Sequence, residues 1–516
     1  MKIKLDDLLE FVEVREIIGE RSLEVNGVSY NSREIDKDFL FVAIKGGIFD
    51  GHSFIEDAIA GGATVIVVED MPKDFKNVTF VVVHDSRLAL ARIAASFYGY
   101  PSSSLTLIGI TGTNGKTTTS YLVESIFKEA GLKTGVMGTI NHRYGDKSIP
   151  ASVTTPESLD LQRILSEMAK DGVTHVVMEV SSHALDLKRV ESLRFNAGVF
   201  TNFTQDHLDY HKTMEHYFKS KARLFKQLLH DGGGERGSYA IINADDPFGK
   251  RLADCTKTDI IYYGVKNRKH IFPEDTMLTL EGISTEISTP IGNYKVKSPL
   301  IGEFNLYNIL AAAGVGISQN ISLEDIKKGI ENLDKVPGRF EQIVNKEDIY
   351  IIVDYAHTGD ALERTLTAIR DLSKGRIITV FGCGGDRDRL KRPLMGAISG
   401  KYSDLSIITS DNPRTEDPNS IINEIEEGIK KLRIKKHRSS DLTANFHQKS
   451  YTTIVERQEA IKCAIDLANP QDTVLIAGKG HENYQILGDK RIAFDDRQVA
   501  KNALTAREKR RSLHNG

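Results

Sequence analysis

Glycines, a lysine and threonines that could bind phosphate stand together in ITGTNGKTTT (110–119). Gly112 and Gly115 can turn backbone N–H groups toward an anion, and the helix expected next adds partial positive charge. Lys116 can reach the outer phosphates of a nucleotide, and the Thr117 hydroxyl can bind magnesium. The spacing departs from the common phosphate-loop pattern, because isoleucine stands where that pattern has its first glycine. A plain glycine turn is the alternative, but Gly-Lys-Thr-Thr between a strand and a helix favours a nucleotide site.

Further polar side chains follow two neighbouring apolar runs. Glu179 ends one of them, in THVVMEVSSHAL (174–185), and is a candidate magnesium ligand because an unpaired buried carboxylate is costly. The other run leads into FTNFTQDHLDYH (200–211), a polar loop in which His207 is a candidate ligand. The same loop also carries Asn202, Asp206, Asp209 and His211.

An amphipathic segment, EHYFKSKARLF (215–225), comes next and predicts a helix. It carries Lys219, Lys221 and Arg223. On spacing alone, the favoured interpretation is that these three cations lie on a solvated helix face.

Alternating strands and helices must position these groups. Short β-branched apolar runs with amphipathic stretches between them argue for parallel sheets covered on both faces, and so for an α/β fold. The runs are 63–69, 79–84, 105–111, 174–180, 197–203, 239–243, 349–355, 376–382, 405–410 and 473–478.

The length of 516 residues predicts several domains. A Pro/Ser linker at 98–104 and a Pro-Gly break at 334–341 place the boundaries, which gives domains at 1–104, 105–337 and 338–516. Alternating polar and apolar residues over 265–300 predict a small antiparallel patch within the middle domain. The basic run at 430–440 is interpreted as a solvated helix face or loop.

Composition excludes some classes of protein. Hydrophobic residues make up 40% and charged residues 27%, with a formal net charge of −3, so nothing calls for a nucleic-acid partner. The three cysteines lie far apart without metal-type spacing, which indicates a reduced, cytoplasmic protein. No long apolar stretch or signal sequence is apparent, so we expect no membrane association.

Taken in order, the motifs resemble the Mur ligases, ATP-dependent enzymes that add amino acids to the peptidoglycan stem. The resemblance spans nearly the whole chain. It is carried by GTNGKTT, MEVSSHAL, FTNFTQDHLDYH, YFKSKARLF, GEFNLYNILAA (302–312), VPGRFE (336–341), VDYAHT (353–358), FGCGGDRDRLKRPLMG (381–396), SDNPRTEDP (410–418) and AGKGHENYQ (477–485).

The resemblance implies a UDP-sugar-binding domain, a central P-loop parallel-sheet domain that binds ATP, and a Rossmann-like C-terminal domain that binds the amino acid. A monomer that closes around its substrates is expected. The last three motifs resemble the members that add meso-diaminopimelate to the D-glutamate γ-carboxylate of UDP-N-acetylmuramoyl-L-alanyl-D-glutamate. The implied route is an acyl phosphate made with ATP, and no protein nucleophile is required.

The resemblance also assigns roles to residues of the ATP domain. Lys221 falls on the lysine that the family carbamylates, which would turn a cation into an anionic magnesium ligand beside Glu179, His207 and Thr117. This reverses the interpretation of Lys221 from spacing. The catalytic residues implied are Lys116, Glu179, His207 and Lys221. The implied ATP contacts are Gly112, Thr113, Asn114, Gly115, Lys116, Thr117, Thr118, Asn305, Arg339 and Asp354.

The two other substrates have implied contacts of their own. Those for the UDP-muramoyl dipeptide are Ser32, Gly47, Ile48, Phe49, Thr154, Thr155, Ser181 and Arg189. Meso-diaminopimelate carries a second carboxylate, which a planar Arg414 fork can bind, while Glu482 can receive its ammonium. Those for diaminopimelate are Arg387, Asp411, Asn412, Pro413, Arg414, Gly478 and Glu482.

Three departures from the family pattern stand out. Gly359 replaces a usual proline, Leu187 replaces a glutamine found in some relatives, and the stretch 430–455 is long and basic. This stretch is interpreted as a surface insertion, with a surface for a partner as the alternative. The main alternative is the lysine-adding version of the same ligase. A folylpolyglutamate synthetase would lack the uridine segment and DNPR, and a P-loop NTPase switch would leave both idle. A binding-only paralogue would be expected to lose Lys116, Glu179 or Lys221.

Overall fold

The computed structural model describes residues 2–46, 50–73, 78–229, 237–444, 446 and 448–514, with side chains described as far as 511. The chain divides into two compact units. The first comprises Met1–Pro273, Ile287–Tyr294 and Tyr307–Ile330, and the second comprises Glu274–Glu286, Lys295–Leu306 and Glu331–Gly516. The predicted α/β fold class is confirmed, with large and mainly parallel sheets in both units.

The first unit begins with a five-stranded sheet in the order β2-β7-β6-β5-β4, parallel except for β2. Apolar side chains such as Leu40, Val65 and Val81 fill its core. The strands of this part are β1 (Ile3–Lys4), β2 (Val14–Ile18), β3 (Glu24–Val25), β4 (Gly27–Ser29), β5 (Phe39–Val42), β6 (Ala63–Val68) and β7 (Thr79–Val83), of which β1 and β3 pair in a separate two-stranded sheet. Its helices are α1 (Leu5–Leu9), α2 (Ile55–Ala60) and α3 (Ser86–Phe97).

The central sheet has eight strands in the order β11-β10-β9-β12-β8-β13-β14-β15. The strands from β9 to β15 in this order are parallel, and β10 and β11 form an antiparallel edge. They are β8 (Thr106–Thr111), β9 (Thr134–Met137), β10 (Asn141–Tyr144), β11 (Lys147–Pro150), β12 (His175–Glu179), β13 (Ala197–Phe200), β14 (Tyr239–Asn243) and β15 (Asp259–Tyr263).

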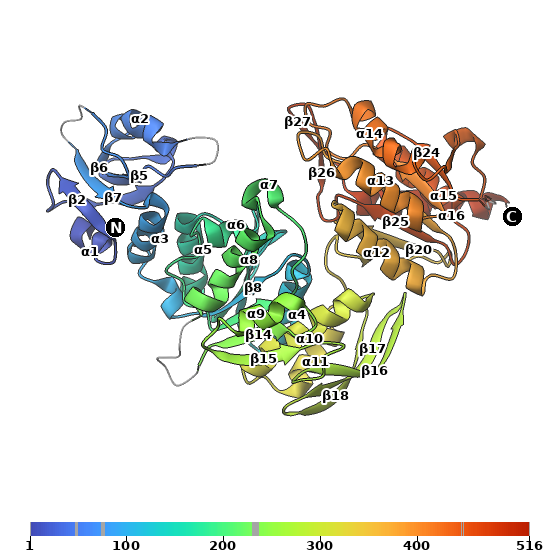
Figure 1. The fold of residues 1–516 in the computed structure, drawn as a ribbon, viewed down its shortest axis with the longest axis horizontal. Coiled ribbons are helices and arrows are strands. Elements are labelled where there is room, and N and C mark those ends of the chain that lie inside the picture. Colours follow the sequence, from blue (N-terminus) through green and yellow to red (C-terminus); the bar gives the residue numbers. More distant parts are fainter. Residues whose placement is uncertain are drawn as a thin grey trace. The chain divides into compact units, whose positions relative to one another are not determined.

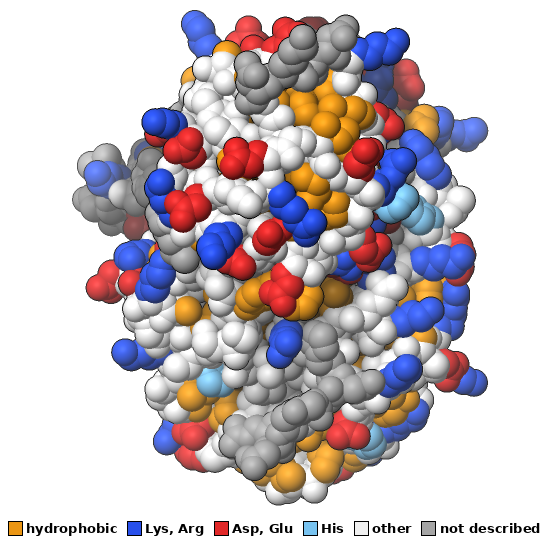
Figure 2. Space-filling model, turned by 90° about the vertical axis from the view of Figure 1, so that its left-hand side faces the viewer, with side chains coloured by type: hydrophobic (Ala, Val, Ile, Leu, Met, Phe, Trp, Pro, Cys, Tyr) orange, Lys and Arg blue, Asp and Glu red, His pale blue; other side chains and the backbone are white. Residues whose placement is uncertain are grey.

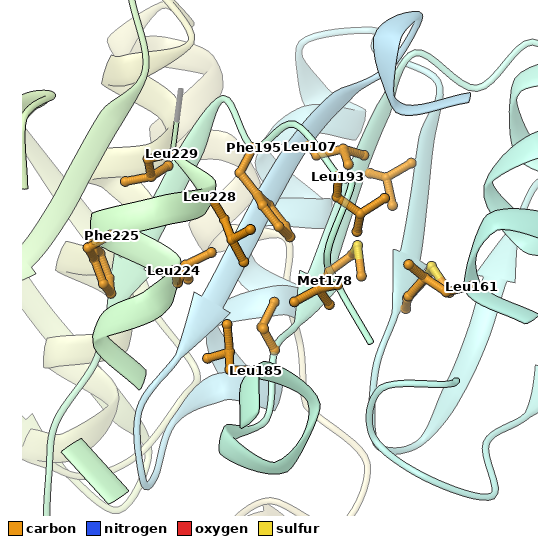
Figure 3. Packing of buried hydrophobic residues seen from close by; sticks show 14 of the residues in the cluster. Leu107, Leu161, Met178, Leu185, Leu193, Phe195, Leu224, Phe225, Leu228 and Leu229 are labelled. Carbon is orange, nitrogen blue, oxygen red and sulfur yellow. The ribbon is translucent and has the colours of Figure 1, made fainter. Parts of the chain in front are cut away.

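Helices surround the central sheet (Figure 1). They are α4 (Lys116–Glu129), α5 (Ser158–Lys170), α6 (Ser182–Asp186), α7 (Leu208–His211), α8 (Met214–Arg223), α9 (Pro247–Ala253), α10 (Glu303–Ser318) and α11 (Leu323–Glu331). A π-helical turn, Leu224–Leu228, continues α8. Figure 3 shows how Leu224 and Leu228 of this turn join Phe195 and Met178 in one buried apolar cluster. This packing fixes α8, and with it Lys221, against the sheet.

A three-stranded sheet, in the order β16-β17-β18, forms within the stretch 265–300 where the sequence predicts a small patch. Its strands are β16 (Phe272–Thr279), β17 (Gly282–Thr289) and β18 (Gly292–Ser298).

The C-terminal sheet of the second unit has seven strands in the order β19-β20-β25-β21-β22-β24-β23, parallel except for β19. Its strands are β19 (Glu341–Gln342), β20 (Tyr350–Asp354), β21 (Ile377–Phe381), β22 (Leu405–Ile408), β23 (Lys435–Lys436), β24 (Ser450–Thr453) and β25 (Thr473–Ala477). A hairpin of β26 (Tyr484–Leu487) and β27 (Lys490–Ala493) follows. The helices are α12 (Gly359–Leu372), α13 (Lys391–Tyr402), α14 (Pro418–Lys430), α15 (Arg457–Leu467) and α16 (Asp496–His514).

The interpretation of 430–455 as a surface insertion is wrong in part. β24 pairs with β22 and β23 inside the C-terminal sheet, and Ser450, Tyr451 and Thr452 are buried. Its polar residues hide the strand from a search for apolar runs. The basic residues before it are mostly exposed, as predicted.

The surface shows no concentration of one charge on the face seen in Figure 2, where acidic and basic side chains are interspersed. No helix among the described residues is long and apolar enough to cross a membrane.

Candidate active site

The glycine-rich loop lies between β8 and α4, as the sequence predicts. Gly112 and Gly115 have φ values of +147° and +89°, which favour glycine. A Cβ on Gly112 would lie 1.8 Å from Thr201 Oγ1, so a side chain there would collide with the neighbouring segment. The same neighbouring segment holds the loop in place, because the Asn202 side chain accepts a hydrogen bond from the Asn114 N–H at 2.9 Å. The loop is therefore shaped before any ligand arrives.

Two lysines meet at this loop. Lys116 donates to the carbonyl oxygens of Gly112 and Thr113 at 2.9 and 3.0 Å. Lys221 donates to the Gly112 carbonyl oxygen at 2.8 Å and is buried. Burial, followed by the charge of Lys116, holds the pKa of Lys221 well below its ordinary value. Lys219, by contrast, is exposed. The interpretation from spacing, a solvated helix face, is therefore wrong for Lys221 but not for Lys219.

Sheet register brings Glu179 to the same loop. β12 pairs with β8 so that Glu179 lies opposite Ile110, just before the loop. The carboxylate is 1% exposed and accepts from the Thr117 hydroxyl at 3.0 Å and from the Thr139 hydroxyl and N–H at 2.9 Å each. Carboxylate and hydroxyl oxygens are ligands that Mg²⁺ prefers, so Glu179 and Thr117 fit a magnesium site.

His207 begins the turn into α7 with a left-handed φ of +52°. Its imidazole lies 3.5 Å from Asp206 and packs edge to face on the His183 ring, with the ring centres 4.9 Å apart. Partial burial outweighs the attraction of Asp206 and lowers the pKa of His207 to about 4. The charges of Lys116 and Lys221 act in the same direction. The ring is thus neutral near pH 7, the form that binds metal.

Four residues predicted to contact the muramoyl dipeptide gather around Glu179. Thr155 donates to the Glu179 carbonyl oxygen at 2.8 Å and accepts from the Ser181 N–H at 3.2 Å. Arg189 donates to the Thr155 carbonyl oxygen at 3.0 Å. Thr154 lies 3.1 Å from the Thr139 hydroxyl that binds Glu179. The candidate dipeptide contacts and the candidate magnesium ligands therefore share one edge of the sheet.

The predicted uridine segment is described in part. Ser32 is half-buried and begins a short 3₁₀ turn, Ser32–Glu34, which the Asn31 side chain caps. Gly47, Ile48 and Phe49 lie outside the described residues.

The second unit carries three of the predicted nucleotide contacts. Asp354 ends β20, where its carboxylate accepts from the Phe340 and Ala356 N–H groups at 2.7 and 3.1 Å. The Arg339 guanidinium lies 4.3 Å from the centre of the Tyr355 ring. Asn305 is buried and donates to the Ile301 carbonyl oxygen at 2.8 Å.

The predicted diaminopimelate residues form a polar cluster at the end of the C-terminal sheet. Asn412 donates to Glu482 at 2.9 Å, and both accept from Lys479 at 3.0 and 3.1 Å. Gly478 has a φ of +118°, and a Cβ there would lie 2.6 Å from the Asp411 carboxylate. The fully buried Lys479 thus holds together the residues expected to bind the amino acid.

Arg414 lies at the rim of this cluster, directly after the buried Pro413. Its φ is +53°, an uncommon value for a residue with a long side chain. Its guanidinium donates to the Gly385 carbonyl oxygen at 2.6 Å. Arg387 is exposed, three residues after Gly384, and its side chain also lies close to this glycine.

Sequence reasoning missed three residues that the structure places in these sites. Asn308 lies one helical turn after Asn305, and its amide oxygen accepts from the Thr119 hydroxyl at 3.3 Å and would lie 2.4 Å from a Cβ on Gly115. The N-x-x-N spacing could have indicated it. Lys479 stands inside the quoted AGKGHENYQ motif. No signal in the sequence marks Thr139, which follows the short strand β9. It contacts Glu179 because β9 pairs with β12 in the sheet.

Comparison with protein families gives three matches along the chain. Residues 110–316 match the Mur ligase middle domain, 338–480 the Mur ligase glutamate ligase domain, and 24–98 the catalytic domain of the Mur ligase family.

Curated relatives match over nearly the full length. Two proteins named UDP-N-acetylmuramoyl-L-alanyl-D-glutamate–2,6-diaminopimelate ligase are similar to this chain. The one from Geobacter metallireducens is 48% identical over 96% of this chain and 97% of its own length. The one from Geobacter sulfurreducens is 47% identical over 96% of this chain and 98% of its own length. A solved structure of a ligase with the same name is 30% identical, with a TM-score of 0.69, and covers 98% of this chain and 100% of its own. The chain belongs to the Mur ligase family.

Proposed function

We propose that this chain is an ATP-dependent ligase that joins meso-diaminopimelate to the D-glutamate γ-carboxylate of UDP-N-acetylmuramoyl-L-alanyl-D-glutamate. One observation carries the proposal. Glu179 links the phosphate loop, through Thr117, to the candidate dipeptide contacts, through Thr155 and Thr139. A site of this kind can present a carboxylate to a phosphate, which is what a ligase requires and a plain NTPase does not.

In the first step, the substrate carboxylate attacks the γ-phosphorus of ATP, forms an acyl phosphate and releases ADP. Both reactants are anionic, so their approach needs fixed positive charge. Lys116 supplies one charge at the loop. Thr117, Glu179, His207 and Lys221, the last as its carbamate, would hold Mg²⁺, which would neutralise phosphate charge.

In the second step, the amine of diaminopimelate attacks the acyl carbon, the C–O bond to the phosphate breaks, and inorganic phosphate leaves with the bonding electron pair. The nitrogen loses a proton as the amide forms, and the leaving phosphate can take this proton up. Asn412 and Glu482, held by Lys479, would bind the far end of the amino acid. Each fixed contact reduces the entropy that must be lost on reaching the reactive geometry.

Selection of the amino acid rests on its second carboxylate. Lysine lacks this group, and Arg414 can offer a planar pair of N–H donors to it. The names of the relatives agree with this choice, since they are called 2,6-diaminopimelate ligases. The lysine-adding version is the second candidate and would have to leave Arg414 without an anionic partner on the substrate.

The decisive experiment measures phosphate release from ATP with the UDP-muramoyl dipeptide and either meso-diaminopimelate, L-lysine or no amino acid. We expect release with diaminopimelate, together with a tripeptide product of the expected mass. Release with lysine but not with diaminopimelate would support a ligase and contradict the argument that Arg414 selects diaminopimelate. Release without dipeptide or amino acid would indicate an NTPase switch instead.

We further propose that the protein acts as a cytoplasmic monomer on these small molecules, without a nucleic-acid or membrane partner. The net charge of −3 and the interspersed charges on the face in Figure 2 argue against a nucleic-acid partner. Sedimentation in the presence and absence of substrates tests it, and a concentration-dependent increase in mass would contradict it.

A further inference from the structure

The ends of three short helices bring two histidines and an aspartate together beside the candidate active site. Asp186 ends α6, His211 ends α7 and His216 lies in the first turn of α8. One potential ligand atom from each lies within 4.8 Å of the other two.

Both ring nitrogens of His216 lie near oxygen atoms that compete for its N–H. Its Nδ1 lies 3.1 Å from the His211 carbonyl oxygen, and its Nε2 lies 3.3 Å from Asp186 Oδ1. Both neighbours can only accept, whereas a neutral imidazole has one N–H. The second nitrogen must therefore carry an additional proton or direct its lone pair at a cation shared with Asp186.

His211 also leaves one ring nitrogen without a hydrogen-bond partner among the described residues. The side chain is 1% exposed, and one ring nitrogen, Nε2, lies 2.9 Å from the Ser182 hydroxyl. The other nitrogen, Nδ1, is buried without a hydrogen-bond partner among the described residues. Buried polar atoms of this kind call for an explanation, and a bound ion is one of the few available.

The carboxylate of Asp186 is already oriented as a metal ligand would be. Tyr210 donates to Oδ2 at 2.8 Å, and the Ser220 hydroxyl, which also lies 2.9 Å from the His216 carbonyl oxygen, lies 3.2 Å from Oδ1. Such outer contacts fix the direction of ligating carboxylates. Two ligands bonded to zinc at roughly 2.0–2.1 Å and a tetrahedral angle lie about 3.3 Å apart. That is also the separation between Asp186 Oδ1 and His216 Nε2.

We propose that Asp186, His211 and His216 form a binding site for a transition-metal ion of the zinc type, distinct from the magnesium ligands proposed at the phosphate loop. Two imidazoles and one carboxylate favour Zn²⁺ or Co²⁺ over Mg²⁺, which prefers oxygen ligands alone. The bound ion would tie α6, α7 and α8 together. α6 follows Ser181 and α7 follows His207. The ion would therefore fix the segments that carry these two candidate site residues.

The test is titration of chelator-treated, tag-free full-length protein with Zn²⁺ by calorimetry and with Co²⁺ by visible absorption. We expect one ion per chain at this site and a tetrahedral Co²⁺ spectrum. Asp186→Asn and His216→Gln should each weaken binding at least tenfold. His216 is about half exposed, so this variant should fold. His270→Gln, which removes an exposed histidine elsewhere, is the matched control and should bind normally.

A further variant separates this site from the phosphate loop. His207→Gln should keep Zn²⁺ binding, because His207 is not one of the three ligands. Loss in His207→Gln with normal binding in Asp186→Asn would overturn the proposal and assign the ion to the candidate magnesium site. Zn²⁺ should also raise the thermal midpoint of the unmodified protein but not that of His216→Gln. An equal rise in both would likewise overturn the proposal.

Discussion

Lys116 and Lys221 donate to the same backbone oxygen, that of Gly112, at 2.9 and 2.8 Å. One lysine comes from the start of α4 and the other from α8, so two distant segments place cations at a single point of the phosphate loop. Like charges this close disfavour each other, and the buried member of the pair gives way. The lowered pKa of Lys221 favours its neutral amine, which is the form that reacts with carbon dioxide.

The first prediction concerns this amine. Lys221→Ala should lower kcat about 100-fold or more, because a carbamate ligand to magnesium would be lost. Small carboxylic acids such as formate should restore part of the activity by supplying the missing anion. The measurement is steady-state phosphate release with all three substrates.

Lys219→Ala is the matched control, since this lysine lies on the same helix but is exposed. It should retain near-normal activity. An unaffected Lys221→Ala, or equal losses in both variants, would refute the carbamate hypothesis.

The contrast between these two lysines shows what the sequence can predict at this site. Glu179 is predictable, because a carboxylate at the end of an apolar strand must meet a partner at the edge of a sheet. Lys221 is not predictable from spacing, because the helix pattern does not reveal which face packs on the phosphate loop. Only the resemblance to a family indicates its role.

The fold follows the same division. Continuous apolar runs predict the strands of the parallel sheets, whereas β24, with the sequence SYTT, is hidden by its hydroxyl residues. Ser450, Tyr451 and Thr452 are nevertheless buried, in a strand that pairs with β22 and β23.

The second prediction concerns Arg414. Arg414→Ala should raise KM for meso-diaminopimelate about 10- to 100-fold, the effect of losing one charge-assisted contact. KM for ATP should change little. Arg438→Ala, which removes an exposed arginine of the same unit, is the control. Similar changes in both KM values would argue against a selective role for Arg414.

The third prediction concerns Lys479, which is fully buried among Asn412, Glu482 and Asp411. Lys479→Met should raise KM for diaminopimelate and lower the thermal midpoint, because two carboxylates lose their cation in a buried site. Adding Glu482→Gln removes one of these charges and should restore part of the lost stability. Direct contact predicts a coupling of about 0.5–3 kcal/mol in this double-mutant cycle. Additive losses would contradict the positioning role.

The fourth prediction concerns pH and His481. Burial, followed by the charges of Arg339 and Arg497, lowers the pKa of His481 to about 3. Its ring packs against Tyr355 with the ring centres 5.2 Å apart, and Nδ1 is buried without a hydrogen-bond partner among the described residues. The folded chain therefore keeps this ring neutral at pH values where the unfolded chain, with an ordinary pKa of about 6.5, binds a proton.

The sign follows from this difference in bound protons. Above about pH 6.5 both states are neutral at this residue, and the free energy of unfolding is unaffected. As the pH falls below that value, the unfolded state alone gains a proton, so stability falls by up to about 1.4 kcal/mol per pH unit. His481→Gln removes the proton-binding group and should flatten this part of the pH dependence. Urea unfolding of both proteins at about pH 7 and about pH 5 measures the effect. A stability difference between the two proteins that is the same at both pH values would show that His481 is protonated equally in the folded and unfolded chains.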